Sequence, residues 1–375
     1  MSRVHLGDVA IEHKETCKED KSMYPIVGLE HLTPEQITLQ NWDLNTENTF
    51  TKVFRKGNIL FGRRRAYLKK AAVAPFDGIC SGDITVIEAK EDKIIPELLP
   101  FVIQNDDLFD FAVGKSAGSL SPRVKWTHLQ NYEFELPDKQ KQHELAKVLW
   151  AIEDTRKSYQ QLIKRTDELV KSQFIELFGD MKLNPFSWPT ASIGEICDIK
   201  SGTTLPAEKE NEGGEIAYIK VADMNIQGNE KYITTSTKFV SAATAGKGVL
   251  PIGTVVFPKN GAAVATNKKR ITHVPTCVDL NTMGVTPRIK INEQYLYLWF
   301  QLLDLDSISL VSAIPQISAK TMGSQVIMLP PMELQEQFAA FVKQSDKSKF
   351  GKEMCDKWSE EIQNSWYQMD RILHQ

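Results

Sequence analysis

The chain repeats itself along its length, and this internal repeat restricts the possible folds more than any other feature. The segment LPDKQKQHELA at residues 136–146 corresponds to LPPMELQEQFA at residues 329–339, a separation of 193 residues. The same separation relates Arg123, within SPRV, to Gln316, within IPQI. Self-similarity at a fixed separation indicates a repeated structural unit. We therefore expect two similar domains, each followed by a helix.

Short runs of β-forming residues, bounded by Gly, Pro or Asp, occur in each repeat and predict strands. They lie at residues 58–61, 84–87, 254–257 and 285–291. Residues 95–111 and 293–305 instead carry apolar residues at helical spacing. We therefore expect an α+β fold with two pseudo-symmetric α/β domains, at residues 1–136 and 183–329. The order of the strands does not follow from the sequence.

A long helix is predicted between the repeats, over residues 142–178, which contain no Gly or Pro. Its apolar residues alternate at spacings of three and four, which is typical of a coiled-coil seam, and Gly179 supplies a stop. We assign residues 137–182 to this helix and residues 330–375 to a second one. A helix running about 55 Å, at 1.5 Å per residue, would extend beyond one domain, so we expect an antiparallel helix pair that separates the domains. The expected seam and assembly residues are Leu145, Leu149, Ile152, Ile163, Val170, Phe338, Trp358 and Ile362.

Candidate DNA-binding residues follow a central strand of each repeat. The net charge is −3, yet residues 49–76 contain eight basic residues and no acidic one, which indicates a local positive field. Lys and Arg contact phosphates, while Arg and Asn can also bind the edges of guanine and adenine. The candidates in the first repeat are Arg63, Arg64, Arg65, Tyr67, Lys69 and Lys70, and those in the second are Lys259, Asn260, Asn267, Lys268, Lys269 and Arg270.

A second candidate loop precedes the long helix of each repeat. Its Gly and Ser residues let the backbone approach a ligand closely, and its polar side chains can contact phosphates or base edges. The aligned residues Arg123 and Gln316 form the best matched pair. The candidates in these loops are Arg123, Lys125, Gln316, Ser318 and Lys320.

The sequence lacks the motifs of several other functions. The five cysteines are far apart and form no C-x-x-C pair, which argues against a zinc site and a disulfide framework. No apolar run approaches the roughly 20 residues of a membrane span, and the N-terminus has no signal-peptide profile, so we expect a cytoplasmic protein with no membrane partner. No G-x-x-x-x-G-K-[ST], G-x-S-x-G or Asn-Pro-Pro-aromatic motif occurs, and we predict no catalytic or metal-binding residue.

Several segments resemble the specificity subunits of type I restriction-modification enzymes. Leu136–Gln142 and Leu329–Gln335 look like the Leu-Pro-Pro-x-x-x-Gln start of that family's conserved helices, although the first reads Leu-Pro-Asp. Glu168–Asp180 is similar to the end of its central helix and Asn184–Trp188 to the link into its second recognition domain. Asp346–Phe350 resembles part of its C-terminal helix. The resemblance covers the whole chain.

What the resemblance implies is a non-catalytic specificity subunit with two target-recognition domains. Each domain is expected to bind one half of a bipartite target in double-stranded DNA. Two copies of a methylation (M) subunit are expected to dock on the conserved helices and to methylate adenine with S-adenosylmethionine. Two restriction (R) subunits are expected to supply ATP-driven translocation and cleavage with Mg²⁺. No cofactor is expected in this chain itself.

Three other interpretations remain open. The chain could be the specificity subunit of a stand-alone methyltransferase, which its sequence does not distinguish from the first interpretation. It could be an autonomous Mg²⁺-dependent nuclease built on Asp83, Glu88 and Lys90, although Asp83 and Glu88 would point to opposite faces of one strand. It could also be a coiled-coil adaptor that binds only protein.

Overall fold

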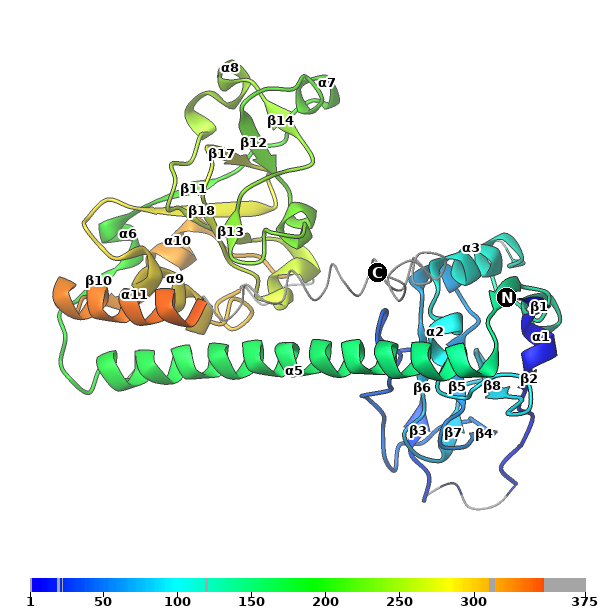
Figure 1. Cartoon of the computed structure of the whole chain (residues 1–375). Coiled ribbons are helices and arrows are strands. Elements are labelled where there is room, and N and C mark those ends of the chain that lie inside the picture. The colour runs from blue at the N-terminus through cyan, green and yellow to red at the C-terminus, as the bar shows by residue number, and fades with distance from the viewer. Residues whose placement is uncertain (1, 19–20, 22, 119–120, 310–313, 347–375) are drawn as a thin grey trace. The chain divides into compact units, whose positions relative to one another are not determined.

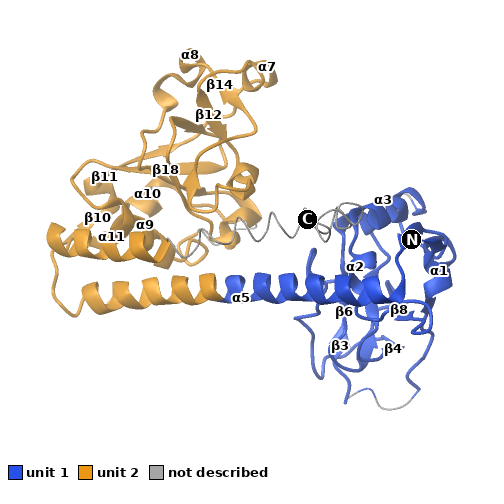
Figure 2. Cartoon of the chain, in the orientation of Figure 1, with its two compact units in different colours: residues 1–161, 350–375 blue, residues 162–349 orange. Residues whose placement is uncertain are grey.

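The structure, a computed structural model, describes residues 2–18, 21, 23–118, 121–309 and 314–346. It divides into two compact units, coloured separately in Figure 2. Unit 1 is residues 1–161 with 350–375, and unit 2 is residues 162–349. Each unit combines strands with helices, so the predicted α+β class with two mixed domains is confirmed.

Unit 1 is built around a four-stranded antiparallel sheet in the order β2-β8-β5-β6 (Figure 1). A three-stranded sheet, β3-β7-β4, and a two-stranded ribbon, β1-β9, complete its strands, and only the pairing of β3 with β7 is parallel among those described. Its elements up to the ribbon are β1 (Ser2–His5), α1 (Leu6–Val9), β2 (Ala10–Glu12), β3 (Ile26–Val27), β4 (Lys52–Phe54), β5 (Ile59–Gly62), η1 (Ala66–Leu68), β6 (Ala71–Val73), β7 (Gly78–Cys80), β8 (Ile84–Ala89), α2 (Leu99–Ile103), α3 (Asp106–Gly114), α4 (Trp126–Leu129) and β9 (Glu133–Leu136).

Unit 2 repeats this topology. Its main sheet has the order β11-β18-β15-β16-β13, its smaller sheet is β14-β12-β17 with a parallel β12-β17 pair, and its ribbon is β10-β19. The elements are β10 (Thr190–Ser192), α6 (Ile193–Ile196), β11 (Cys197–Ser201), α7 (Ala207–Glu210), β12 (Ile216–Ile219), η2 (Val221–Asn225), β13 (Tyr232–Ile233), β14 (Phe239–Val240), α8 (Ala242–Ala245), η3 (Gly246–Gly248), β15 (Val255–Pro258), η4 (Gly261–Thr266), β16 (Arg270–Thr272), β17 (Thr276–Val278), β18 (Thr282–Pro287), α9 (Glu293–Leu302), α10 (Ala319–Gly323), β19 (Val326–Met328) and α11 (Met332–Asp346).

The central sheet of each unit is buried on both faces. In unit 1, Ile59 packs into one apolar cluster and its neighbour Leu60 into another. In unit 2, Val255 and Val256 divide in the same way. Because successive side chains of a strand point to opposite faces, both faces must be covered, and such strands appear in the sequence as short continuous apolar runs.

Most predicted elements are present, with two local differences. The expected strand at 285–291 ends at Pro287 in β18. The expected helix at 95–111 is two helices, α2 and α3, because the Asn105 side chain accepts a hydrogen bond from the Asp107 N–H and starts a new helix there.

The long helix α5 (Lys139–Phe178) has 40 residues, and the boundary between the units falls within it, after Gln161. It ends at Gly179, whose φ of +82° is the left-handed conformation that glycine adopts readily. A Cβ atom at this position would lie 2.5 Å from Pro185 Cγ. Both properties require glycine at the stop.

A glutamine ties the first turn of α5 to unit 1, and another ties the first turn of α11 (Met332–Asp346) to unit 2. Gln142 accepts a hydrogen bond from the Ile95 N–H (2.9 Å) and donates one to the Pro137 carbonyl (2.8 Å). Gln335, the residue 193 positions later, accepts from the Asn292 N–H (2.9 Å) and donates to Pro330 (2.8 Å). The glutamine of the repeated motif therefore has a structural role, since it satisfies buried backbone groups.

Within unit 2, α11 packs against the C-terminal part of α5 and runs antiparallel to it (Figure 1). The Phe338 ring lies 5.6 Å from the rings of Phe174 and Phe178. Of the expected seam residues, Leu145, Leu149, Val170 and Phe338 are buried, Ile152 and Ile163 are half-buried, and Trp358 and Ile362 lie outside the described residues.

Candidate nucleic-acid interface

Two loops meet in each unit at the end of a central strand. The strand loop follows β5 in unit 1 (residues 63–70) and β15 in unit 2 (residues 259–269). The helix loop precedes α4 in unit 1 (residues 114–125) and α10 in unit 2 (described for residues 314–318). These are the two segments that the sequence marked as candidates for DNA contact.

Three backbone hydrogen bonds join the loops of unit 1. The Arg63 N–H donates to the Asp83 carbonyl (3.0 Å), and the Arg63 carbonyl accepts from Val124 (3.0 Å). The Arg65 N–H donates to Pro122 (2.9 Å). The strand loop is thereby fixed between the start of β8 and the helix loop.

The same three hydrogen bonds occur in unit 2. Lys259 donates to the Asn281 carbonyl (2.8 Å) and accepts from Ile317 (2.8 Å), and Gly261 donates to Pro315 (2.8 Å). We call this arrangement the two-loop junction. Because its backbone contacts are identical in both units, residues at matched positions can be compared directly.

Matched side chains stand opposite one another at each junction. Arg64 forms an antiparallel backbone bridge with Arg123 in unit 1, and Asn260 forms one with Gln316 in unit 2. The residue after the first member has a positive φ in both units, +54° at Arg65 and +72° at Gly261. A non-glycine residue in this region is uncommon and marks a constrained, frequently functional position.

A charged cluster occupies the unit 1 junction. Arg123 donates from Nε and Nη2 to the two carboxylate oxygens of Asp83 (2.7 and 3.2 Å). Arg64 donates from Nε to Ser121 Oγ (2.5 Å), and its Nη1 lies 3.5 Å from the same carboxylate. The Arg123 hydrogen bond is the main cause that lowers the pKa of Asp83, so this carboxylate is ionised at neutral pH.

The side chains of the remaining candidates in unit 1 differ in exposure and in whether they have a partner within the unit. Arg65, Tyr67 and Lys125 are exposed, whereas Lys69 is ion-paired with Asp106 (2.6 Å). Lys70 donates to the Leu29 carbonyl (2.8 Å), and the buried Nε of Arg63 has no hydrogen-bond partner in the described structure.

The candidates of unit 2 also divide into free and engaged side chains. Gln316 and Lys320 are exposed and Lys259 is half-buried. Lys268 donates to Asn225, and Asn267 holds a positive φ of +54°. Ser318 accepts a hydrogen bond from the Thr321 N–H (3.0 Å) and so caps α10.

Lys269 and Arg270, which the sequence suggested as DNA contacts, are engaged in the interior of unit 2. The Lys269 side chain is fully buried, and its Nζ donates to Asn267 Oδ1 (2.6 Å) and to the Leu303 carbonyl (2.7 Å). Arg270 donates from Nη2 to the Met224 carbonyl (3.0 Å). Lys269 therefore has no free surface to offer a nucleic acid.

The basic stretch 49–76 is less positive than its local sequence suggests. Arg55 is ion-paired with Glu15 and with Asp77 (2.9 Å), and acidic partners also engage Arg64 and Lys69. These partners come from other parts of the chain. A stretch without acidic residues therefore does not predict basic side chains that are free of ion pairs.

The residues of the alternative nuclease site do not converge. Asp83 is bound to Arg123, while the Glu88 carboxylate lies 2.6 Å from His13 Nδ1. Lys90 donates to the Gly7 carbonyl (2.7 Å). No group of three or more His, Cys, Asp or Glu side chains able to hold a metal ion occurs among the described residues.

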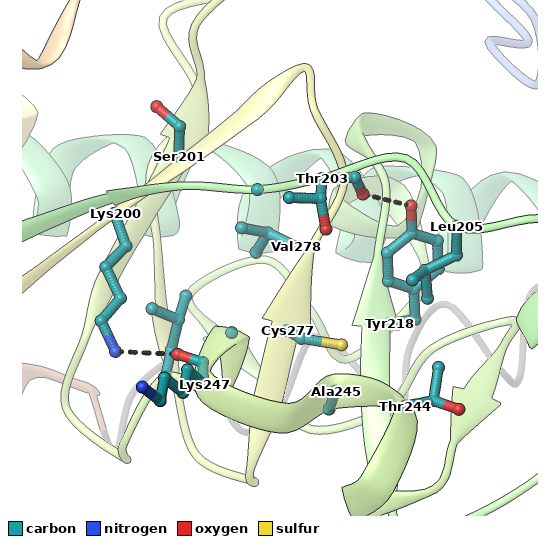
Figure 3. Close-up of a pocket in the computed structure, with 13 residues that line it drawn as sticks. Lys200, Ser201, Thr203, Leu205, Tyr218, Thr244, Ala245, Lys247, Cys277 and Val278 are labelled. Carbon is teal, nitrogen blue, oxygen red and sulfur yellow. Dashed lines mark hydrogen bonds between the residues drawn. The ribbon is translucent and has the colours of Figure 1, made fainter.

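Unit 2 also contains a cavity of about 310 Å³ between β11, β12, β17 and α8. Figure 3 shows the Lys200 ammonium directed at the main chain of Lys247 (3.3 Å) and the Tyr218 hydroxyl at the Thr203 carbonyl (2.9 Å). Its lining contains no carboxylate and no histidine. Separately, no described helix is long and apolar enough to cross a membrane.

Two units of one topology, each with the same junction, define a chain with two copies of one domain. The type I restriction modification DNA specificity domain matches this chain twice, over residues 3–165 and 185–353. The chain therefore belongs to the type I restriction-modification DNA specificity family.

Individual proteins that are similar to this chain come from type I restriction systems. The specificity subunit of the type I restriction enzyme EcoDI from Escherichia coli is 28% identical over 176 residues, which cover 44% of this chain and 38% of that protein. The chain thus spans well under half the length of this curated relative. The type I S subunit from M. genitalium has the same fold, with a TM-score of 0.54, 15% identity and coverage of 97% and 95% of the two chains. A chain from a type I restriction-modification system has a TM-score of 0.50, 21% identity and coverage of 96% and 94%.

Proposed function

We propose that this chain is the DNA sequence-recognition subunit of a type I restriction-modification complex and has no catalytic centre of its own. Each unit binds one half of a bipartite target in double-stranded DNA. The observation that supports this best is the duplicated two-loop junction, because it presents Arg, Asn and Gln side chains at matched positions of two domains from a DNA specificity family. Such side chains can read base edges.

The exposed basic residues around each junction supply sequence-independent affinity. Arg65 and Lys125 in unit 1 and Lys320 in unit 2 contact phosphates, as does the half-buried Lys259, and together they fix the position of each unit on the duplex. Because its proposed partner is DNA, the chain acts in the cytoplasm under this proposal.

The helices assemble the complex. Two M subunits dock on α5 and on the C-terminal segment 330–375, and R subunits join them. S-adenosylmethionine, ATP and Mg²⁺ act on those partners. Leu162 (44% exposed) and Leu169 (54%) lie seven residues apart on one face of α5, and they support docking of a protein there.

The decisive experiment is to express the chain with its cognate M subunit in a methylation-free host and to map methylated adenines across the genome. We expect one motif with two specific halves and an unread spacer, which disappears when the chain is omitted. A continuous motif, or methylation that does not depend on the chain, would contradict the proposal.

A second measurement addresses the nuclease interpretation. The purified chain, incubated with DNA and Mg²⁺ and no partner, is expected to leave the DNA intact, because Asp83, Glu88 and Lys90 are held by separate partners. Cleavage that is lost in Asp83→Asn would favour the nuclease instead.

A further inference from the structure

The two junctions share a backbone but differ in side-chain chemistry. In unit 1 the matched positions carry two arginines and a carboxylate, and in unit 2 they carry only amides. The charged trio is Arg64, Arg123 and Asp83, and the amide trio is Asn260, Gln316 and Asn281. Residues that occupy matched positions but differ in side-chain chemistry are candidates for the cause of a sequence difference between the two halves of the target.

The guanidinium of Arg123 is held on one edge only. Asp83 accepts from Nε (2.7 Å) and from Nη2 (3.2 Å), which leaves both protons of Nη1 and one of Nη2 without a partner in the described structure. Two parallel N–H donors on this remaining edge match the O6 and N7 acceptors of guanine. The side chain is 41% exposed, so a base edge can reach it.

Asp83 reduces the entropy that Arg123 loses when it binds a base. A free arginine loses rotamer entropy when it binds, but Arg123 is already oriented by two hydrogen bonds to a carboxylate that is itself only 21% exposed. Asp83 also lies 3.5 Å from Arg64. It is therefore a positioning residue for the arginines.

The unit 2 trio offers different donors and acceptors. Gln316 is exposed, and its amide makes no hydrogen bond within the described part of the chain. Asn260 Nδ2 donates to the Leu280 carbonyl (3.2 Å), while its Oδ1 is buried without a partner. An amide pairs one donor with one acceptor, which suits N6 and N7 of adenine and cannot give two hydrogen bonds to the acceptors of guanine.

We propose that the half-target bound by unit 1 contains a guanine read by Arg123, with Asp83 as its positioning residue, and that the half-target bound by unit 2 contains an adenine read by Gln316. This inference rests on the proposed function, since it requires that the two units bind the two halves of one target.

The first test is the methylation motif of the complex with Arg123→Gln. We expect one guanine in one half to become degenerate while the other half keeps its bases. Asp83→Asn should relax the same guanine, and a merely structural role would instead lower methylation at all sites equally. Arg55→Gln is the matched control, because Arg55 is also paired with carboxylates, Glu15 and Asp77, that belong to neither loop.

A second variant guards against a folding defect. Arg123→Lys keeps the positive charge but replaces the planar fork by one flexible ammonium group, which can still donate to O6 and N7 of guanine. It should therefore keep the salt dependence of DNA binding and weaken the guanine preference without abolishing it. In binding assays, replacing that guanine by 7-deazaguanine should weaken wild-type binding about 5- to 150-fold. The same replacement should weaken binding of Arg123→Lys by a smaller factor.

The outcomes separate this inference from the proposed function. A wild-type complex without a bipartite motif overturns both. A bipartite motif whose bases are unchanged in Arg123→Gln and Arg123→Lys overturns this inference alone. For unit 2, Gln316→Ala should make one adenine of the other half degenerate, and an unchanged half removes Gln316 from base reading.

Discussion

Lys269 carries an ammonium group into the interior of unit 2. Its side chain is 0% exposed, and burial is the main cause that lowers its pKa to about 8, against the opposing charge of Asp304. Its two acceptors, Asn267 Oδ1 and the Leu303 carbonyl, join the strand loop to the segment after α9. A basic residue next to the proposed interface is thus a titratable part of the fold.

The stability of unit 2 should therefore depend on pH through Lys269. Because the folded pKa of about 8 lies below the ordinary lysine value of about 10.4, the unfolded chain binds more protons between these values. The free energy of unfolding consequently rises as the pH increases through this window, by at most about 1.4 kcal/mol per pH unit. Denaturant unfolding of wild type and Lys269→Met from pH 7 to 10 should show this difference in slope. Lys268→Met, at a half-buried neighbour that donates to Asn225, should match the wild-type slope. If Lys269→Met does too, Lys269 does not titrate there.

Arg65 should contribute charge to DNA binding without a structural role. Its side chain is exposed, whereas Arg64 is paired and Arg63 Nε is buried. We expect Arg65→Ala to weaken binding to all sequences alike and to reduce the slope of log K against log salt by about 1. Lys56→Ala, at an exposed position outside both loops, should leave the slope unchanged. An unaltered slope in Arg65→Ala would remove this residue from the interface.

At the scale of elements, four aromatic rings join the end of α5 to unit 2. Phe174 stacks on Tyr295 at 5.4 Å, and Phe178 meets the same ring edge-on at 4.8 Å. Phe338 of α11 contacts both phenylalanines at 5.6 Å. Aromatic pairs in these geometries add to the stabilisation that burial provides, so α5 and α11 are fixed to the unit by one cluster.

Truncating this cluster should destabilise unit 2. Phe338→Ala removes a fully buried ring and is expected to lower the free energy of unfolding by about 3 to 5 kcal/mol. Calorimetry should show a lowered melting temperature for one transition. Leu169→Ala, at a 54% exposed position of α5, is expected to change stability by no more than about 0.5 kcal/mol. Equal effects of the two substitutions would mean that Phe338 is not a core residue of the folded chain.

The elements that depend on local pattern could be predicted from the sequence. The α5 boundaries follow from the absence of Gly and Pro and from Gly179, and the strands follow from short apolar runs. The prediction of the seam residues was less accurate. Phe174 and Phe178 are buried at steps of four, and the predicted alternation of three and four did not include them. The strand order β2-β8-β5-β6 joins residues far apart in sequence, and no local pattern encodes such pairings.

The site was predictable in position and less so in detail. Aligning the repeats matched Arg123 with Gln316 and matched the two strand loops with each other. The backbone contacts of the two units agree with this alignment. No local pattern indicates that Lys269 is buried or that Asp83 binds arginines, because partners of both side chains lie elsewhere in the chain. Comparing the repeats at this third position, Asp83 against Asn281, would have suggested that Asp83 belongs to the junction.

For the whole molecule, the proposed function predicts that the length of α5 sets the spacer of the target. Seven residues inserted after Ile163, with seven more after Asp346, preserve the heptad and add roughly 10 Å at 1.5 Å per residue. This corresponds to about three base pairs at 3.4 Å each. We expect the methylation motif to keep its bases and to gain a longer spacer. An active variant with the original spacer would show that the helices do not set the distance.

The aromatic cluster also fixes where chains of different specificity can be joined. Phe174 and Phe178 lie in α5 but belong to the core of unit 2, so a transplantable second unit does not begin at the Gly179 turn. A chimaera joined near Gln160 and Gln161, which are exposed, keeps every ring with its own partners. A chimaera joined at Gly179 sets foreign aromatic side chains against Tyr295 and Phe338. Under the proposed function, the boundary for exchanging half-targets between chains therefore lies near Gln161, in the middle of α5, where one compact unit ends and the other begins.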